Sequence, residues 1–510
     1  MVRFCTRLKI LSLFASAAFA CMPLKANAQE NTVNLTLPQA IKMAVEKNLD
    51  VKAELYNPAS AEADIRKNKG IYDPLASFLV NYQQSVTQPA SIFQAGTFLS
   101  REKILEINPG ISQLIPTGAN LGLVFYNTWT QNNSDPSRGF LNDYWQSQLA
   151  LTLTQPLLKN FGKETTELNI SVAKFNKEAS LEQFKSKLID TVAQARIQYH
   201  QLYSLRENLE VRKTSLALAE KILSDTQAQV KAGVLPSMEI LNAQFGVATM
   251  QKNLIDAERA VKDQVDSLRV LLQLPLGVEI IPVDTPFTDS YAVDESAEIR
   301  KAMAGRPDLK QLQVTLKTSE LQTRVARHQT LPQLDFLAST ALNGLDPKFN
   351  RDMEKVGSTD YPAWSVGLQF SYPLGNRAAE NDYIKSKLKV GQTETQIKSL
   401  EDTVTNDVRN AIRAMQSNYK QLDVTARGSA YAEEVLQAYI KKHKVGLATN
   451  KDVLDEENNL VTAKGNQIQA VADYNNAITA LWKATGELLD KEGIKVSEKD
   501  ADSLYEKNRN

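Results

Sequence analysis

Apolar residues recur at a spacing of seven along a long stretch in the first half of the chain. Eight of them follow one another in this way: Leu181, Leu188, Ala195, Leu202, Leu209, Leu216, Leu223 and Val230. After Gly233 the series resumes with Ile240, Val247, Leu254, Val261 and Leu268. A spacing of seven is typical of the seam between long packed helices. Because glycine readily adopts the left-handed conformation that ends a helix, the pattern predicts an antiparallel helical hairpin with its tip at Gly233.

The same arrangement returns around Gly446, with the seam residues Val408, Met415, Leu422 and Leu436 before it and Val453, Leu460, Tyr474 and Leu481 after it. The helix that leads to each glycine follows a Pro, at Pro156 and at Pro373. At about 1.5 Å per residue, each of these outgoing helices could reach roughly 100 Å. The returning helices end sooner, near Leu272 and Leu489, so we expect residues 37–68 and 295–328 to continue them.

Strict alternation of apolar and polar residues predicts β-strands elsewhere. Between Trp364 and Tyr372 every second residue is apolar, and the residues between them are small or polar. We predict strands near 332–342 and 363–373, an extra pair on both sides of the turn at Pro116, Thr117 and Gly118, and, by similarity between the two halves of the chain, strands near 75–85 and 145–155. A soluble β-sandwich alternates equally well. Apolar faces with aromatic ends and strands of about 10 residues favour a transmembrane β-barrel.

The chain is internally duplicated. The segment IKMAVEKNLDVK from Ile41 matches IRKAMAGRPDLK from Ile299, and the same offset carries Arg66 onto Arg324 and Pro74 onto Pro332. Each half therefore contains a helix, strands, a long helix, a glycine turn and a returning helix. Pro and Gly residues between 274 and 287 separate the halves. We predict a first repeat over residues 29–285, a second over 286–490 and a polar tail over 491–510.

Residues 1–28 have the features of a secretory signal: basic residues, an apolar run from Ile10 to Ala20, and a small-residue cleavage site ending at Ala28. Lipidation of Cys21 after cleavage at Ala20 is the alternative. Both cysteines, Cys5 and Cys21, lie in this leader, so we expect no disulfide in the mature chain. Four of the 59 basic residues lie there as well, which leaves 55 against 59 acidic ones, and no basic footprint for nucleic acid.

Features of an enzyme are absent from the sequence. The three histidines, His200, His328 and His443, lack the spacing of metal ligands, and there is no phosphate-binding or dinucleotide-binding glycine motif. We therefore expect neither catalysis nor a cofactor.

The leader, the twofold order of helices and strands, the segments AIKMAVEKNLDVK and AMAGRPDLK, the strand ends QPLL and YPLG and the two glycine turns together resemble the outer membrane efflux proteins, the TolC-like family. The resemblance implies a mainly α-helical protein with a transmembrane β-barrel: a homotrimer whose barrel in outer-membrane lipid continues into a long periplasmic α-helical barrel. Such trimers are exit ducts of tripartite pumps or type I secretion systems. Their partners are a periplasmic adaptor protein and an inner-membrane transporter.

The resemblance also implies functional residues at the two tips. In this family acidic residues just past the second turn constrict the periplasmic entrance, and Asp452 and Asp455 stand at the matching positions, with Glu239 at the equivalent place in the first repeat. Three copies of such carboxylates around an axis would attract cations. The alternative for Asp452 and Glu239 is an acidic residue favoured by the dipole in the first turn of a helix. Adaptor docking would involve the tip residues Gly233, Val234, Leu235, Gly446, Leu447 and Ala448.

A different class of protein also has long coiled-coil segments. A secreted or outer-membrane adhesin, or a periplasmic adaptor, would have them without transport. An adaptor would carry one hairpin, whereas here strands and hairpins are duplicated in step.

Overall fold

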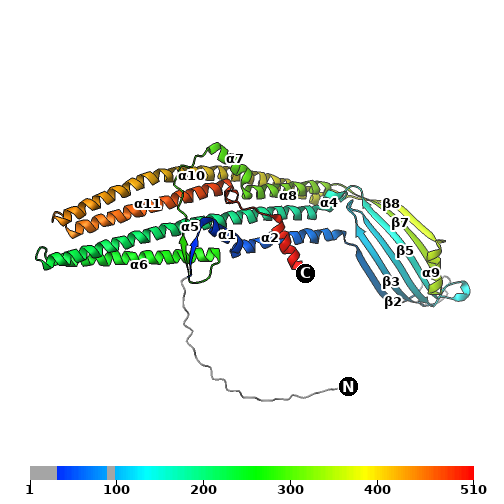
Figure 1. Cartoon of the computed structure of the whole chain (residues 1–510). Coiled ribbons are helices and arrows are strands. Elements are labelled where there is room, and N and C mark those ends of the chain that lie inside the picture. The colour runs from blue at the N-terminus through cyan, green and yellow to red at the C-terminus, as the bar shows by residue number, and fades with distance from the viewer. Residues whose placement is uncertain (1–30, 89–97, 510) are drawn as a thin grey trace, which may run out of the picture.

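The computed structural model describes residues 31–88 and 98–509, and it shows an elongated molecule with three zones (Figure 1). Two helical hairpins form one end, a six-stranded sheet forms the other, and short helices surround the long ones between them. The predicted leader and its cleavage site, as well as Cys5 and Cys21, lie outside the described residues.

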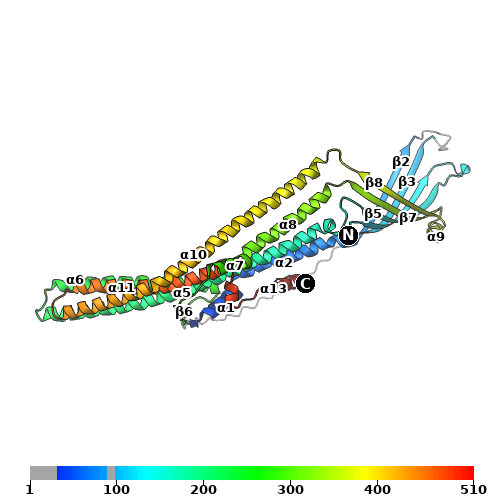
Figure 2. The ribbon, with the colours of Figure 1, turned by 90° about the horizontal axis from the view of Figure 1, so that it is seen from above.

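The helices carry the length of the molecule. The longest are α5 (Leu168–Lys231, 64 residues) and α10 (Arg377–Lys444, 68 residues), and they return as α6 (Met238–Leu272) and α11 (Asn450–Thr485). The shorter ones are α1 (Leu37–Lys47), α2 (Leu49–Lys69), α4 (Lys163–Thr166), α7 (Glu295–Gly305), α8 (Pro307–Gln329), α9 (Phe349–Ser358), α12 (Leu488–Lys491) and α13 (Glu498–Arg509). Both predicted hairpins are confirmed, and their tips lie at the same end of the molecule (Figure 2).

The seam of α5 follows the predicted residues only in part. Leu188, Ala195 and Leu202 are buried at the spacing of seven. Closer to the tip, Ser215 and Ile222 are the buried positions, one residue before the predicted Leu216 and Leu223. The buried stripe of α5 therefore follows the predicted repeat of seven only in the part of the helix farther from the tip.

The returning helix α6 is continued by α2, as the sequence predicts. At the junction the buried Asn48 donates from Nδ2 to the carbonyl oxygen of Leu271 at 3.1 Å, and its Oδ1 accepts from the backbone N–H groups of Asp50 and Val51. One side chain thus caps the start of α2 and satisfies the end of α6, because the terminal N–H and C=O groups of helices lack partners within the helix.

In the second repeat α8 continues α11 by a different contact. Gly305 and Gly486 lie against each other: a Cβ added at Gly486 would be 3.0 Å from the carbonyl carbon of Gly305. Gly486 also has a φ of +76°, which favours glycine. The structural equivalent of Asn48 here is Arg306, whose guanidinium bonds Asp308 and Asp407 of α10.

The sheet contains β2 (Leu75–Thr87), β3 (Ser100–Leu114), β4 (Asn120–Asn132), β5 (Asp143–Pro156), β7 (Gln333–Asp346) and β8 (Pro362–Ser371), in that order and antiparallel throughout. These are the predicted strands, including the extra pair on either side of Gly118, where φ is +88°. The helix α9 connects β7 to β8 and packs against β5 and β7.

The pairing register keeps the apolar residues on one face. Across β5, β7 and β8, Leu151 pairs with Thr340 and Thr340 with Trp364, while Leu153 pairs with Ala338 and Ala338 with Val366. On the opposite face, Thr152 pairs with Ser339 and Ser339 with Ser365. A slip of one residue would reverse the two faces, so the alternation in the sequence specifies the register.

A second, two-stranded sheet was not predicted from the sequence. β1 (Asn31–Leu35) pairs in parallel with β6 (Val278–Pro282). β6 lies within residues 274–287, the segment that we interpreted as a separator between the repeats. Tyr199 of α5 anchors it, since its hydroxyl donates to the carbonyl oxygen of Leu35 at 2.9 Å. This sheet and the adjoining helices α1, α5 and α6 share one buried apolar cluster.

The polar tail contains a helix. α13 packs on α2, where the ring centroid of Tyr505 lies 4.5 Å from the guanidinium carbon of Arg66. The ammonium of Lys177, on α5, lies 2.7 Å from Asp502 and 2.8 Å from Glu498 of α13, and 3.0 Å from Glu62 of α2. Charged contacts thus hold α13 in place, together with the buried Ala501 and with Ile494 and Val496, which pack on an apolar cluster of α1, α2 and α5.

Candidate functional site at the hairpin tips

Both tips end their outgoing helices with the same backbone motif. Gly233 has φ +74°, and its N–H donates to Val230, while the N–H of Val234 donates to Gln229, both at 2.9 Å. Gly446 has φ +77° and the corresponding bonds, from its own N–H to His443 and from Leu447 to Lys442. This is the Schellman arrangement, which needs a left-handed residue and so explains the repeated glycine.

The residues that follow these glycines are apolar and exposed. In a Schellman motif an apolar residue at this position usually packs back onto the helix. Here Val234 and Leu447 are 70% and 77% exposed. They border a groove of about 790 Å³ between the two tips, together with Leu235, Ala448 and other residues of both turns. The predicted docking residues of the two repeats thus adjoin one groove.

A buried asparagine joins the two hairpins. Asn450, the first residue of α11, is 1% exposed. Its Nδ2 donates to Glu239 Oε2 of α6 at 3.2 Å, and its Oδ1 lies 2.7 Å from Nε2 of His443 on α10. No local pattern predicts this bridge, because Glu239 lies 211 residues before Asn450.

Asp452 forms a capping box with Thr449 at the start of α11. Its carboxylate accepts from the N–H of Thr449 at 2.7 Å and from the hydroxyl at 2.8 Å, while the N–H of Asp452 donates to that hydroxyl at 3.2 Å. The bonds from Thr449 lower the pKa of Asp452 below its usual value. The sequence T-x-x-D is a signature of this box. Asp452 therefore lies in the first turn of a helix, as in the alternative interpretation of the sequence, and the capping box with Thr449 is an addition that the structure provides.

The other two acidic residues lie in different surroundings. Glu239 is partly buried, and its carboxylate accepts the hydrogen bond from Asn450. Asp455 is exposed and lies beside a second hollow, which Phe245 and Leu454 also line. Within the described residues no hydrogen bond links Asp452, Asp455 and Glu239 to one another. A single chain thus brings the three carboxylates to one end without joining them.

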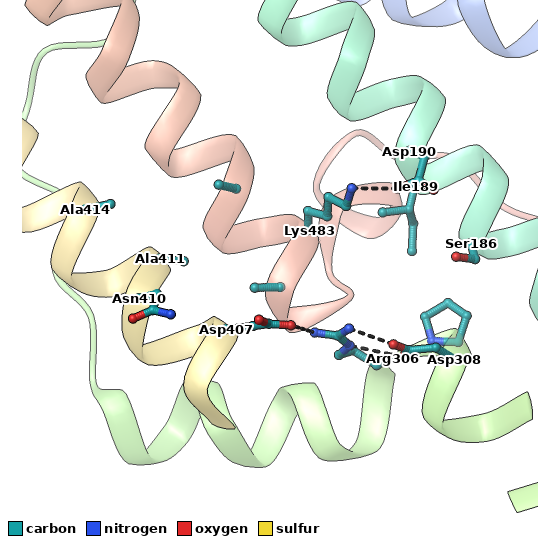
Figure 3. Close-up of a pocket in the computed structure, with 13 residues that line it drawn as sticks. Ser186, Ile189, Asp190, Arg306, Asp308, Asp407, Asn410, Ala411, Ala414 and Lys483 are labelled. Carbon is teal, nitrogen blue, oxygen red and sulfur yellow. Dashed lines mark hydrogen bonds and ion pairs between the residues drawn. The ribbon is translucent and has the colours of Figure 1, made fainter. Parts of the chain in front are cut away.

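A hollow of about 440 Å³ lies among α5, α8, α10 and α11 (Figure 3). Its charges are paired: Arg306 Nη1 is 2.9 Å from Asp407, its Nη2 is 2.6 Å from Asp308, and Lys483 is 2.7 Å from Asp190. Burial raises the pKa of Asp308, but the bonds from Arg306 outweigh this and lower it. Because every charge there has a partner, we interpret this hollow as a structural junction between the repeats.

The part of the chain that the structure describes holds no cluster of three or more His, Cys, Asp or Glu side chains suited to a metal ion. In the same part, no helix combines the length and apolarity needed to cross a membrane.

Comparison with known families identifies the protein. Residues 120–273 and 299–487, one segment from each repeat, match the family described as "Outer membrane efflux protein". The chain belongs to the outer membrane efflux protein family. The resemblance inferred from the sequence is thereby confirmed.

Relatives of this efflux protein are distant in sequence and close in fold. Outer membrane efflux protein BepC of Brucella suis is 23% identical over 361 residues, which cover 70% of this chain and 76% of BepC. Outer membrane protein TolC of Escherichia coli is 25% identical over 271 residues, 51% of this chain and about half (53%) of TolC. The CmeC outer membrane channel of Campylobacter jejuni superposes with a TM-score of 0.64 over 99% of this chain and 98% of CmeC, at 14% identity.

Family membership assigns the efflux protein its place and its role. It is an outer-membrane exit duct that extends into the periplasm, as the sequence predicted. The family consists of channels rather than enzymes.

Proposed function

We propose that three copies of this efflux protein close a β-barrel in the outer membrane and an α-helical barrel in the periplasm. The duct passes substrates from the periplasm or from an inner-membrane transporter to the exterior. The observation that carries the proposal is the sheet: apolar residues lie on one face of every strand, interrupted at Asn127 and Ser147 next to α9, and within the described residues no further strand pairs with the edges β2 and β8. Lipid does not tolerate unpaired backbone groups, so further copies must complete it.

The tips dock a periplasmic adaptor protein in this proposal. Two tips per chain make six per trimer. Each pair presents exposed apolar residues, Val234 and Leu447, beside a groove whose charged lining includes Glu239 and Lys444. Apolar centres with polar rims are typical of protein interfaces.

Asp452 and Asp455 line the periplasmic entrance and favour cations in this proposal. The carboxylate of Asp452 then has two roles: it caps the first turn of α11, and it provides negative charge at the entrance. The capping bonds keep it ionised, because they lower its pKa. Its two roles are therefore compatible.

Single-channel conductance of the detergent-purified protein in a planar bilayer tests the proposal. Asp452→Asn and Asp455→Asn, alone and together, remove charge, and Asn at position 452 still offers an oxygen to Thr449, so the cap survives. We expect cation-selective channels in the parent and reduced selectivity in the double variant. Glu434→Gln, an exposed site on α10, is the control with unchanged selectivity.

The outcomes separate the parts of the proposal. Conducting trimers whose selectivity does not change in the double variant contradict the acidic entrance and leave the duct intact. Folded protein that never conducts, even when the tips are loosened by Asn450→Ala, contradicts the closed duct and favours an adhesin.

A further inference from the structure

The two edge strands of the sheet run in opposite directions. β2 begins at Leu75, directly after the short helix Gly70–Tyr72 that ends α2, and runs away from the helices. β8 ends at Ser371 and leads back to α10. A chain placed beside a rotated copy of itself would therefore bring β8 next to β2 in an antiparallel arrangement, the same pairing that joins every other strand of the sheet.

The sheet also has the stagger of a closed barrel. Starting from Leu75, successive pairs lead across the sheet through Ser112, Gly122, Thr152 and Ser339 to Ser365. Ser365 lies six residues before Ser371, the helix-side end of β8. Six residues span about 20 Å along a strand, and five steps between strands span about 24 Å, which gives a tilt of about 40°. Outer-membrane barrels have tilts of roughly 35–45°.

The faces of the two edges match. Phe78 and Val80 of β2 lie on the apolar face, because Phe78 pairs with Pro109 and Val80 with Ile107, and Leu368 and Val366 lie on it at the other edge. Phe78 and Leu368 are 70% and 67% exposed. Pairing β8 with β2 of a second copy keeps these side chains on one continuous surface.

We infer that all six strands enter the barrel, so that three chains close 18 strands, and that the β3–β4 hairpin sets the width of the exit. The inference rests on the trimer proposed above. With neighbouring strands about 4.8 Å apart and tilted by about 40°, 18 strands give a diameter of about 36 Å between opposite backbones, and twelve strands would give about 24 Å. Barrels of 16–18 strands leave an aqueous channel.

A wide exit has a consequence for the cargo. Once the roughly 5 Å of side chain on each wall is subtracted, the lumen is wide enough for extended polypeptide as well as small solutes. The barrel then does not select cargo by size, and bulky polymeric substrates are the class that needs the additional hairpin.

Strand number can be counted directly by electron cryomicroscopy of the trimer in lipid nanodiscs. We expect 18 strands, with β8 of each chain paired to β2 of the next. A trimer with twelve strands and the β3–β4 hairpin outside the barrel would overturn the inference while leaving the proposed duct in place. Absence of any trimer would instead remove the proposed function on which the inference rests.

A deletion variant tests the width. Replacing residues 88–143 by Asn-Gly joins Thr87 to Tyr144 by a two-residue hairpin turn and lets Tyr82 pair with Leu149, which keeps the apolar faces together. Neutral polymers of graded size, added on the outer side, should enter the parent channel up to a radius about 1.9-fold larger than in the variant, because the side chains leave lumens of about 26 and 14 Å. Equal size limits in two conducting channels would contradict the inference. If the variant does not fold, the strand count of the parent still decides.

Discussion

Asn450 donates a hydrogen bond of 3.2 Å to Glu239, a residue 211 positions earlier, and so ties the tip of one repeat to the tip of the other. The bond is inaccessible to solvent on the side of Asn450, which is 1% exposed. A buried polar group that loses its partner costs more than the bond itself contributes. The tips of one chain are therefore expected to move as a unit.

Asn450→Ala should release the two tips from each other. It leaves Glu239 and His443 without this partner, at a cost of about 1–3 kcal/mol, which corresponds to at least about fivefold faster amide exchange near the tips. Hydrogen exchange followed by mass spectrometry measures this effect. Asn459→Ala is the matched control, since Asn459 is exposed and donates to Glu456 of its own helix. Equal exchange in both variants would show that the bridge does not hold the tips.

Gly246 of α6 leaves no room for a side chain unless Leu454 of α11 moves. A Cβ at this position would lie 2.5 Å from Cδ1 of Leu454 on α11. Gly246→Ala should therefore separate the helices at a cost of about 1–3 kcal/mol, although alanine alone favours a helix. We expect larger single-channel conductance than in the parent.

Two further variants test whether the clash with Leu454 causes the larger conductance of Gly246→Ala. Gly246→Ala combined with Leu454→Ala should restore the parent conductance, because the second change makes room. Gly465→Ala, at a helical glycine of α11 where the added Cβ would lie 3.8 Å from Nδ2 of Asn208, should leave conductance unchanged. A larger conductance in Gly465→Ala as well would mean that helix propensity, rather than the clash, opens the channel.

Features set by neighbouring residues could be predicted from the sequence, and features set by distant ones could not. The turns at Gly233 and Gly446 follow from one glycine after an apolar repeat, and the strand from Trp364 follows from alternation. β1 has only five residues and pairs with β6 far along the chain, so no local pattern predicts it. The bridge of Asn450 and the attachment of α13 likewise depend on side chains brought together from separate elements.

Lys177→Met should detach the C-terminal helix. Burial alone would lower the pKa of Lys177, but its bonds to Asp502, Glu498 and Glu62 outweigh this and raise it, so the ammonium is charged at all ordinary pH values. Without it three carboxylates face one another. A loss of about 1.4 kcal/mol in the docking of α13 makes trypsin cleavage within that helix about tenfold faster. Lys174→Met is the control: Lys174 is exposed on α5, the helix that carries Lys177, and its replacement should leave the cleavage of α13 unchanged.

His200→Leu should make the protein less sensitive to acid. His200 is 3% exposed, and burial, together with the charge of Arg196, lowers its pKa to about 4. In the unfolded chain the pKa of this histidine is about 6.5. Between that pH and the lower pKa of the folded state, the unfolded state binds a proton and the folded state does not. The resulting loss of stability begins near pH 6.5, is complete near pH 4, and amounts to about 2 kcal/mol per chain at pH 5.

Thermal unfolding of the solubilised protein at pH 7.5 and pH 5 measures this loss. The parent should lose more stability between the two pH values than His200→Leu, because leucine has no proton to bind. His328→Leu serves as the control, since His328 is exposed on α8 and its replacement leaves the buried ring in place. If the parent and His200→Leu lost equal stability, the buried ring would have to be protonated in the folded state. A positively charged imidazolium would then lie buried next to Arg196. Within the described residues neither ring nitrogen of His200 has a hydrogen-bond partner that could stabilise this charge.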